Sequence, residues 1–209
     1  GYHIPSNLFA VVVLEYVQEM FPMLKDASIL YHEIKNGVTQ YGTWTENGIE
    51  RYCYEVDGKG GCNRMDDANL PSLLSIPYFD PKQMTNIIWK QTYQWIWSPS
   101  NPYFYQGSEA SGIGSPHTPR HYIWPLSLIT RGLVDPPERS NMIHLVKRTM
   151  ARGTAHESFH KDNHLRITRE DFSWPNSLYK ELIEPRKAKD ALTAHTAPPA
   201  GRRLFPRFL

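Results

Sequence analysis

Two aspartates stand side by side at Asp66 and Asp67, between Arg64 and Asn69. Carboxylates clustered in this way can accept hydrogen bonds from sugar hydroxyls or donate a proton, and mutual repulsion raises the pKa of one of them when both are partly buried. The same residues are typical of a helix start, because carboxylates stabilise a helix N-terminus. The sequence therefore leaves open a chemical role and a capping role for the acidic doublet.

Residues 156–160 read His-Glu-Ser-Phe-His and match the H-E-x-x-H pattern of zinc hydrolases. That chemistry requires a continuous helix, which places His156 and His160 on one face as metal ligands and Glu157 beside them as the base. A Gly-Thr pair precedes the motif and Lys-Asp-Asn follows it, so the flanks lack the apolar stripe of a buried helix. A zinc hydrolase is therefore the less favoured hypothesis, and we expect no metal site.

A third candidate is the loop 112–119, which reads Gly-Ile-Gly-Ser-Pro-His-Thr-Pro. It is not a phosphate loop, because it lacks Gly-Lys-Ser/Thr and no strand is expected before it. Its prolines would hold His117 in a fixed place, although an exposed histidine in a plain turn is an equally good interpretation. Trp124, which precedes a proline, could stack on a sugar ring or belong to the core.

The charge pattern separates a body from a tail. The chain has 209 residues and a formal net charge of +2. Residues 186–209 carry six basic side chains and one acidic one, together with several prolines. This tail shows no core-forming period, so we expect it to be disordered. The basic character is confined to it, and the body over residues 1–185 therefore gives no reason to expect a nucleic-acid partner.

Membrane and secretion signals are weak in this chain. The longest strongly apolar run, residues 8–14, is too short to span a bilayer. No basic-then-apolar signal opens the chain, and its first residues are typical of mid-protein sequence, so a leader could precede them. Cys53 and Cys62 flank a glycine-rich turn, and a disulfide across that turn and two free thiols are equally good interpretations.

Apolar periodicity predicts a mainly α chain with about seven helices, a small β-hairpin element and long loops. The helices are expected over residues 6–21, 25–36, 66–76, 82–97, 122–133, 138–152 and 174–184. Residues 41–57 change to a period of two, which predicts a short strand or hairpin. The stretch 98–119 is rich in proline and aromatic residues and is expected to be an ordered, functional loop.

Three of these helices carry recognisable boundary signals. Ser6 or Asn7 is expected to cap the first helix, and the pair Asn36-Gly37 to end the second. The acidic doublet is expected to begin the third helix.

Several segments, in this order along the chain, resemble glycoside hydrolase family 125. The most specific are MDDANLPSLLSIPY (65–78) and GIGSPHTP (112–119), and the resemblance extends from about residue 2 to 184. The others are IPSNLFAVVVLEY (4–16), YEVDGKG (54–60), NPYFYQG (101–107), YIWPLSLI (122–129), HESF (156–159) and TREDFSWPNSLYKELI (168–183).

The resemblance implies a metal-independent, exo-acting α-1,6-mannosidase that inverts configuration, needs no cofactor and acts on mannose-containing glycans. It also implies an (α/α)6 toroid of twelve helices around a central pocket. About seven helices therefore imply a partial toroid, with residues 1–185 forming the C-terminal half of the catalytic domain. Helices that would face missing partners are expected to expose apolar stripes, so a non-catalytic glycan binder or an inactive fragment is the alternative.

The resemblance also implies roles for single residues. Glu157 matches the family's general base, and Asp66 and Asp67 match an acidic pair at the pocket. The family's general acid is expected in another aspartate pair just upstream of residue 1; otherwise Asp66 or Asp67 is the acid.

The remaining matched positions are expected to bind substrate. His117 and Trp124 line the pocket in this interpretation. Arg64 and Asn69 hold mannose hydroxyls beside the doublet, and His156 orients the base or binds a hydroxyl.

Overall fold

The structure is a computed structural model, and it describes residues 1–184. The prediction of a disordered tail over 186–209 lies outside the described residues. Within residues 1–184, none of the helices combines the length and apolar character needed to cross a lipid bilayer.

The described part of the chain contains seven α-helices, the number predicted, and these with two 3-10 turns account for just under half of its residues. They are α1 (Ile4–Met20), α2 (Lys25–Tyr41), α3 (Ile76–Phe79), α4 (Ile87–Ile96), α5 (Pro125–Val134), α6 (Arg139–Thr149) and α7 (Ser173–Ile183), with 3-10 turns at Pro81–Thr85 and Pro136–Glu138. The α-helices α4, α5, α6 and α7 lie within the predicted ranges, or within a residue of them.

The strands of residues 1–184 are short, and all their pairings are antiparallel. They are β1 (Tyr2–His3), β2 (Thr43–Glu46), β3 (Ile49–Tyr52), β4 (Glu55–Val56), β5 (Cys62–Asn63), β6 (Phe104–Gln106), β7 (Ser111–Ile113), β8 (Tyr122–Ile123), β9 (Ser158–His160) and β10 (Asn163–Thr168). Two three-stranded sheets have the orders β1-β4-β5 and β10-β9-β8, and β2-β3 and β6-β7 are hairpins. The predicted hairpin over 41–57 is therefore confirmed, whereas β6-β7 and β9-β10 fall where the sequence indicated loops.

Cys53 and Cys62 form a disulfide across the turn between β4 and β5, which decides between the two interpretations of these cysteines. The turn contains Gly58 and Gly60, both with positive φ, a conformation that favours glycine. The bond closes the β4-β5 turn beside β1, where the chain enters α1.

The predicted boundaries of the first two helices were wrong. α1 begins after His3, whose ring Nδ1 accepts the Ser6 N–H at 3.3 Å, so neither Ser6 nor Asn7 is the cap. β1 feeds directly into the helix and shifts its start toward the N-terminus. α2 continues through Gly37 to Tyr41, because its last turn buries Val38 in the core and tertiary packing outweighs the weak propensity of one glycine.

The predicted helix over 66–76 was also wrong. Residues 66–75 form a turn-rich loop, and only Ile76–Phe79 is helical. Pro71 disfavours helical backbone at the residue before it. The carboxylate of Asp66 also binds two backbone amides seven and eight residues further along, which folds the segment back on itself.

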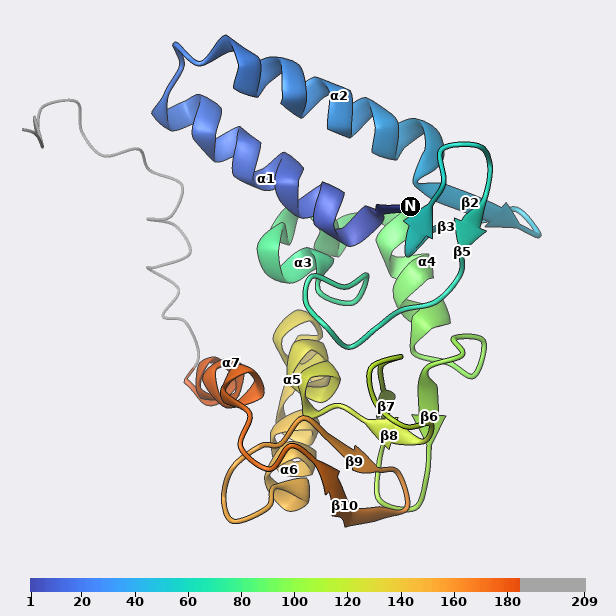
Figure 1. The fold of residues 1–209 in the computed structure, drawn as a ribbon, viewed down its shortest axis with the longest axis vertical. Coiled ribbons are helices and arrows are strands. Elements are labelled where there is room, and N and C mark those ends of the chain that lie inside the picture. The colour runs from blue at the N-terminus through green and yellow to red at the C-terminus, as the bar shows by residue number, and fades with distance from the viewer. Residues whose placement is uncertain (185–209) are drawn as a thin grey trace, which may run out of the picture.

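Figure 1 shows α1 and α2 as a hairpin at one end of the molecule, and α5, α6 and the β8-β9-β10 sheet at the other. The loop between β5 and α3 crosses the middle of this view. One core cluster joins α2, α4 and the β2-β3 hairpin, and a second joins α5, α6, α7 and β9. The acidic doublet therefore lies where the two halves of the described structure meet.

Candidate functional site

Asp66 is buried, and its carboxylate stabilises the conformation of its own loop. It is 0% exposed, and its two carboxylate oxygens accept the N–H groups of Leu73 at 2.8 Å and Leu74 at 3.0 Å. Its own N–H donates to Asn101 Oδ1 at 3.1 Å. Burial raises the pKa of Asp66 to about 8, and the charge of Asp67 acts in the same direction, while the two amides oppose the shift. Both oxygens of Asp66 are thus occupied by backbone.

Asp67 is held in one position by side chains. Its Oδ1 accepts the N–H of Asn69 at 3.0 Å, and the Asn69 amide group donates to both oxygens at 3.0 and 3.1 Å. The Tyr54 hydroxyl donates to Oδ2 at 3.4 Å. Asp67 is only 3% exposed, so it presents a fixed hydrogen-bond acceptor. The candidate site thus includes Tyr54, which sequence reasoning missed although it opens one of the matched motifs.

The two most specific motifs meet at this point. Ala68 N–H donates to the carbonyl of Gly114 at 3.0 Å, and the Asn69 amide donates to Ser115 Oγ at 3.2 Å. The same hydroxyl oxygen accepts the N–H of His117 at 3.2 Å. Ser115 therefore joins the doublet loop to the 112–119 loop, and places exposed His117 next to this junction.

Trp124 is a core residue. It is 2% exposed and packs with Ala68 and Leu126, and its Nε1 donates to Thr118 Oγ1 at 2.9 Å. Of the two interpretations of this tryptophan, the structure supports the core. Its indole packs with Ala68 of the doublet loop and has no free face on which a sugar could stack.

Contacts of Arg169 link Glu157 to the junction of the doublet loop and the 112–119 loop. The Glu157 side chain is 15% exposed, its N–H donates to the Arg169 carbonyl at 3.1 Å, and its Oε1 lies 3.7 Å from Arg169 Nη1. The guanidinium covers the ring of Phe172, which packs edge-on against Trp124. The sequence analysis did not single out Arg169, although this residue lies in the matched TREDF segment.

The zinc hypothesis required a helix through residues 156–160, and it was wrong. Residues 158–160 form β9, and an extended chain rises about 3.3 Å per residue, so His156 and His160 stand too far apart to share one ion. His160 instead accepts the N–H of Asp162 and packs against Tyr122. Within residues 1–184, no three His, Cys, Asp or Glu side chains converge in an arrangement that could hold a metal.

His156 is fully buried beside the ring of Phe159. Neither ring nitrogen has a hydrogen-bond partner among the described residues. Burial lowers the pKa of His156 to about 4, with a smaller effect from His164, so the imidazole is neutral in the fold. Its ring packs edge-on against Phe159 of β9, and it directly precedes Glu157, so its burial helps to hold the backbone that carries Glu157.

This burial gives a pH prediction. Because the folded pKa of His156 lies near 4 and the unfolded value near 6.5, its contribution to stability is present above pH 6.5 and is lost as the pH falls toward 4. The loss should reach about 3 kcal/mol. His156→Gln should flatten the dependence of the unfolding free energy on pH in this window, as measured by denaturant titrations. His144→Gln, at an exposed histidine, is the control and should not flatten it.

The Arg64 side chain packs on the β2-β3 hairpin and not beside the acidic doublet. Its guanidinium covers the ring of Trp44 at 4.1 Å and pairs with Glu46 at 3.6 Å, against the β2-β3 hairpin. The structure therefore places Asp66, Asp67 and Asn69 in one loop, with the backbone of His117 in the adjoining loop. Glu157 is linked to this region through the packing of Arg169 on Phe172 and of Phe172 on Trp124. Arg64 does not lie beside the doublet.

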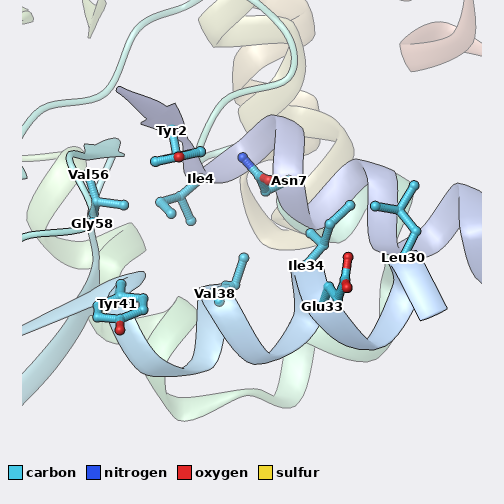
Figure 2. A pocket seen from close by; sticks show the side chains of 11 residues that line it. Tyr2, Ile4, Asn7, Leu30, Glu33, Ile34, Val38, Tyr41, Val56 and Gly58 are labelled. Atoms are coloured by element: carbon cyan, nitrogen blue, oxygen red, sulfur yellow. The ribbon is translucent and has the colours of Figure 1, made fainter.

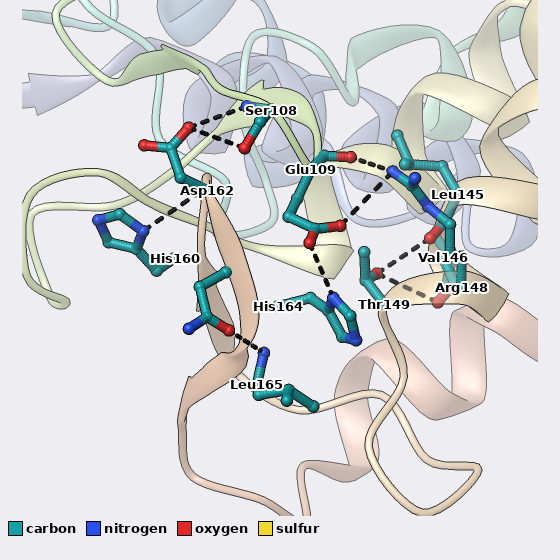
Figure 3. Close-up of polar contacts among 11 residues, drawn as sticks. Ser108, Glu109, Leu145, Val146, Arg148, Thr149, His160, Asp162, His164 and Leu165 are labelled. Carbon is teal, nitrogen blue, oxygen red and sulfur yellow. Dashed lines mark hydrogen bonds and ion pairs between the residues drawn. The ribbon is translucent and has the colours of Figure 1, made fainter.

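The hairpin that follows Glu157 is anchored by a polar network (Figure 3). Glu109 pairs with His164 of β10 at 3.3 Å and with Arg148 of α6 at 4.0 Å, and Asp162 accepts the N–H of Ser108 at 2.8 Å. These contacts fix the β9-β10 hairpin to the 107–110 loop and to α6. They limit the movement of the strand that begins directly after Glu157.

Comparisons with known proteins identify one matching family and two similar proteins. The sequence model of the family described as metal-independent alpha-mannosidase (GH125) matches residues 1–184. The chain is 36% identical over 193 residues to the meiotically up-regulated gene 157 protein of Schizosaccharomyces pombe, covering 87% of this chain and 38% of that protein.

A solved structure from Streptococcus pneumoniae is also similar, with a TM-score of 0.83 and 42% identity. It is described as a metal-independent alpha mannosidase in a non-productive substrate complex with alpha-1,6-mannobiose. The match covers 87% of this chain and 46% of that one. The chain thus spans less than half the length of both relatives.

Proposed function

The chain belongs to glycoside hydrolase family 125, the metal-independent α-mannosidases, and from this premise we propose that it supplies the C-terminal half of an inverting exo-α-1,6-mannosidase. The observation that carries the proposal is the junction of the 65–69 and 112–119 segments, to which Glu157 is connected. The α-1,6-mannobiose bound by the similar S. pneumoniae protein supports a mannosyl glycan as substrate.

In this proposal Glu157 is the general base. Inversion requires an ionised carboxylate that activates water on one face of the sugar and a carboxylic acid that protonates the leaving oxygen on the other, about 6.5–9.5 Å away. Arg169 lies within ion-pair distance of Glu157 and holds its carboxylate in place. Asp67, with Asn69 beside it, would accept hydrogen bonds from mannose hydroxyls, and His117 would close the pocket at its exposed edge.

The general acid is proposed to come from outside residues 1–184. The carboxylate oxygens of Asp66 both accept backbone amides, so Asp66 cannot reach a substrate without unfolding its loop. Both oxygens of Asp67 accept hydrogen bonds from Asn69, and one of them also accepts the Tyr54 hydroxyl, so the side chain is held in place as an acceptor. Asp67 is therefore proposed to bind substrate while Asp66 holds the loop that carries it, and an aspartate upstream of residue 1 remains the proposed acid.

A partial (α/α)6 toroid is the proposed architecture for residues 1–185. α1 and α2 expose large apolar side chains, among them Phe9, Val13, Tyr16, Met20, Ile29 and Leu30. A cavity of about 430 Å³ opens between the start of α1 and α2, lined by Tyr2, Ile4 and Val38 among others (Figure 2). Further helices of a longer protein, packed on this face, would remove the exposed apolar surface from water.

The proposed activity is tested on the full-length protein that contains this chain. We expect it to hydrolyse α-1,6-mannobiose, to release β-mannose first in a proton NMR time course, and to be unaffected by a chelator. Release of α-mannose would contradict inversion. Binding of mannobiose without turnover would favour the alternative of a non-catalytic glycan binder.

A further inference from the structure

The disulfide lies where the chain enters the acidic doublet loop. Cys53 directly precedes Tyr54, and Cys62 directly precedes Asn63 at the end of β5. Residues 64–66 alone separate Asn63 from Asp67. Tyr54 and Asp67 therefore lie close to the two ends of one covalent link, and the disulfide holds together the two chain segments that carry them.

The backbone and the ring of Tyr54 are both held by the β1-β4-β5 sheet. Its N–H donates to the Asn63 carbonyl at 3.0 Å, and its carbonyl accepts the Ile4 N–H at 2.9 Å. The ring packs edge-on against His3 of β1, with ring centroids 4.5 Å apart. Tyr54 therefore has little freedom of its own, and the position of its hydroxyl depends on the integrity of this small sheet.

The Tyr54 hydroxyl connects this sheet to the Asp67 carboxylate. It donates to Oδ2 at 3.4 Å, whereas the other donors described for this carboxylate belong to Asn69 in the same loop. Burial and the charges of Asp67 and Asp66 raise the pKa of Tyr54, so its hydroxyl stays protonated and remains a donor. The tyrosine thus anchors the carboxylate to a sheet that the disulfide closes.

The disulfide is accessible from the side of Cys62. Cys53 is fully buried, whereas Cys62 is half-buried and lines a surface hollow of about 270 Å³ beside Gly60 and Gly61. A small thiolate in this hollow attacks the Cys62 sulfur and forms a mixed disulfide, while Cys53 leaves as a thiolate and takes up a proton. A second thiolate then frees Cys62. Two small thiols are oxidised to one disulfide, and two protein thiols are formed.

We propose that the Cys53–Cys62 disulfide positions Asp67 through Tyr54, so that reduction by a small thiol weakens the binding of the mannoside. In the reduced protein the segments that carry Tyr54 and Asp67 lose their covalent link, and the hydroxyl no longer holds the carboxylate in one place. The inference rests on the proposed function, because that function makes Asp67 the acceptor of mannose hydroxyls.

Tyr54→Phe tests the hydrogen bond while keeping the ring. In the full-length protein it should raise KM for α-1,6-mannobiose about three- to tenfold, the effect of one hydrogen bond, and leave kcat nearly unchanged. Dithiothreitol should raise KM of the wild type to a similar extent. It should add little in Tyr54→Phe, because both changes break the same link. Tyr16→Phe, at an exposed tyrosine of α1, is the control and should keep the wild-type KM and response to dithiothreitol.

Cys53→Ala/Cys62→Ala shows whether this disulfide is the one that responds. The double variant should have the raised KM without dithiothreitol and should not respond to it. A disulfide that merely stabilises the fold gives another result: reduction unfolds a fraction of the molecules, which lowers the apparent kcat and leaves KM unchanged. That result, or an equal response to dithiothreitol in the wild type and the double variant, overturns the inference and leaves the proposed function standing.

Hydrogen exchange of the full-length protein decides the inference even if mannobiose is not cleaved and the proposed function fails. The amides of Ala68 and Asn69 donate to the Gly114 carbonyl and to Asp67, so their exchange reports on the doublet loop. Dithiothreitol should speed exchange at these two amides and leave α6 unchanged. Equal exchange of the doublet loop in the oxidised and reduced proteins would show that the disulfide does not hold it.

Discussion

Glu157→Gln is expected to lower kcat for α-1,6-mannobiose by about 10²- to 10⁴-fold, the usual contribution of a general base. The amide has the shape of the carboxylate but cannot accept the proton of the attacking water. Binding of mannobiose should be retained, because Asp67 and Asn69 are unchanged and the contact to Arg169 can be kept by the amide oxygen. Steady-state kinetics and calorimetric titration of the full-length protein measure the two effects separately.

Glu170→Gln is the matched control. Glu170 follows Arg169 in the chain, but its carboxylate pairs with Arg152 at 3.2 Å on the surface. An exposed ion pair of this kind contributes little, so this variant should keep wild-type kinetics and stability. Turnover by Glu157→Gln at a rate close to that of the wild type would remove Glu157 from the role of base, and a parallel loss in both variants would indicate a general disturbance of the 157–170 hairpin.

Helices whose apolar residues keep a helical spacing over a long segment could be predicted, because that pattern lies within the segment itself. The helices α5 and α7 lie close to the predicted ranges, and α1 differs mainly at its start. The loop 66–75 was not predictable in this way. Its acidic start is typical of a helix cap, but Asp66 binds amides seven and eight residues further along, and such a contact has no local signal.

The strands β9 and β10 were missed for a related reason. They are short, and their stability depends on distant contacts: β9 pairs with β8, about 35 residues away, β10 pairs with β9, and His164 of β10 contacts Glu109. The H-E-x-x-H pattern therefore indicated the wrong local structure, while the resemblance that pointed to Glu157 did not depend on it. Spacing alone also could not show that Trp124 is buried and Arg64 remote, since both facts depend on packing between distant segments.

Substitution of Gly114 should also have a large effect on stability and activity, because the backbone of this residue joins the 112–119 loop to the doublet loop. Its carbonyl accepts the N–H of Ala68, and its own N–H donates to the Tyr103 carbonyl at 2.8 Å. A Cβ at this position would collide with the Tyr122 carbonyl and would lie 2.7 Å from the Tyr105 ring. A backbone carbonyl cannot turn aside as a flexible side chain can, so the 112–119 loop itself must shift.

Gly114→Ala should therefore lower the free energy of unfolding by about 3 kcal/mol and displace Ala68 together with the Asp67 carboxylate, so that hydrolysis of mannobiose falls as well. Denaturant titration and kinetics on the same preparation measure both effects. Gly37→Ala is the matched control, because its Cβ would meet nothing within 4 Å in the middle of α2. It should instead raise stability by about 0.5–1 kcal/mol. A Gly114→Ala protein as stable and as active as the wild type would show that the two motifs do not depend on this contact.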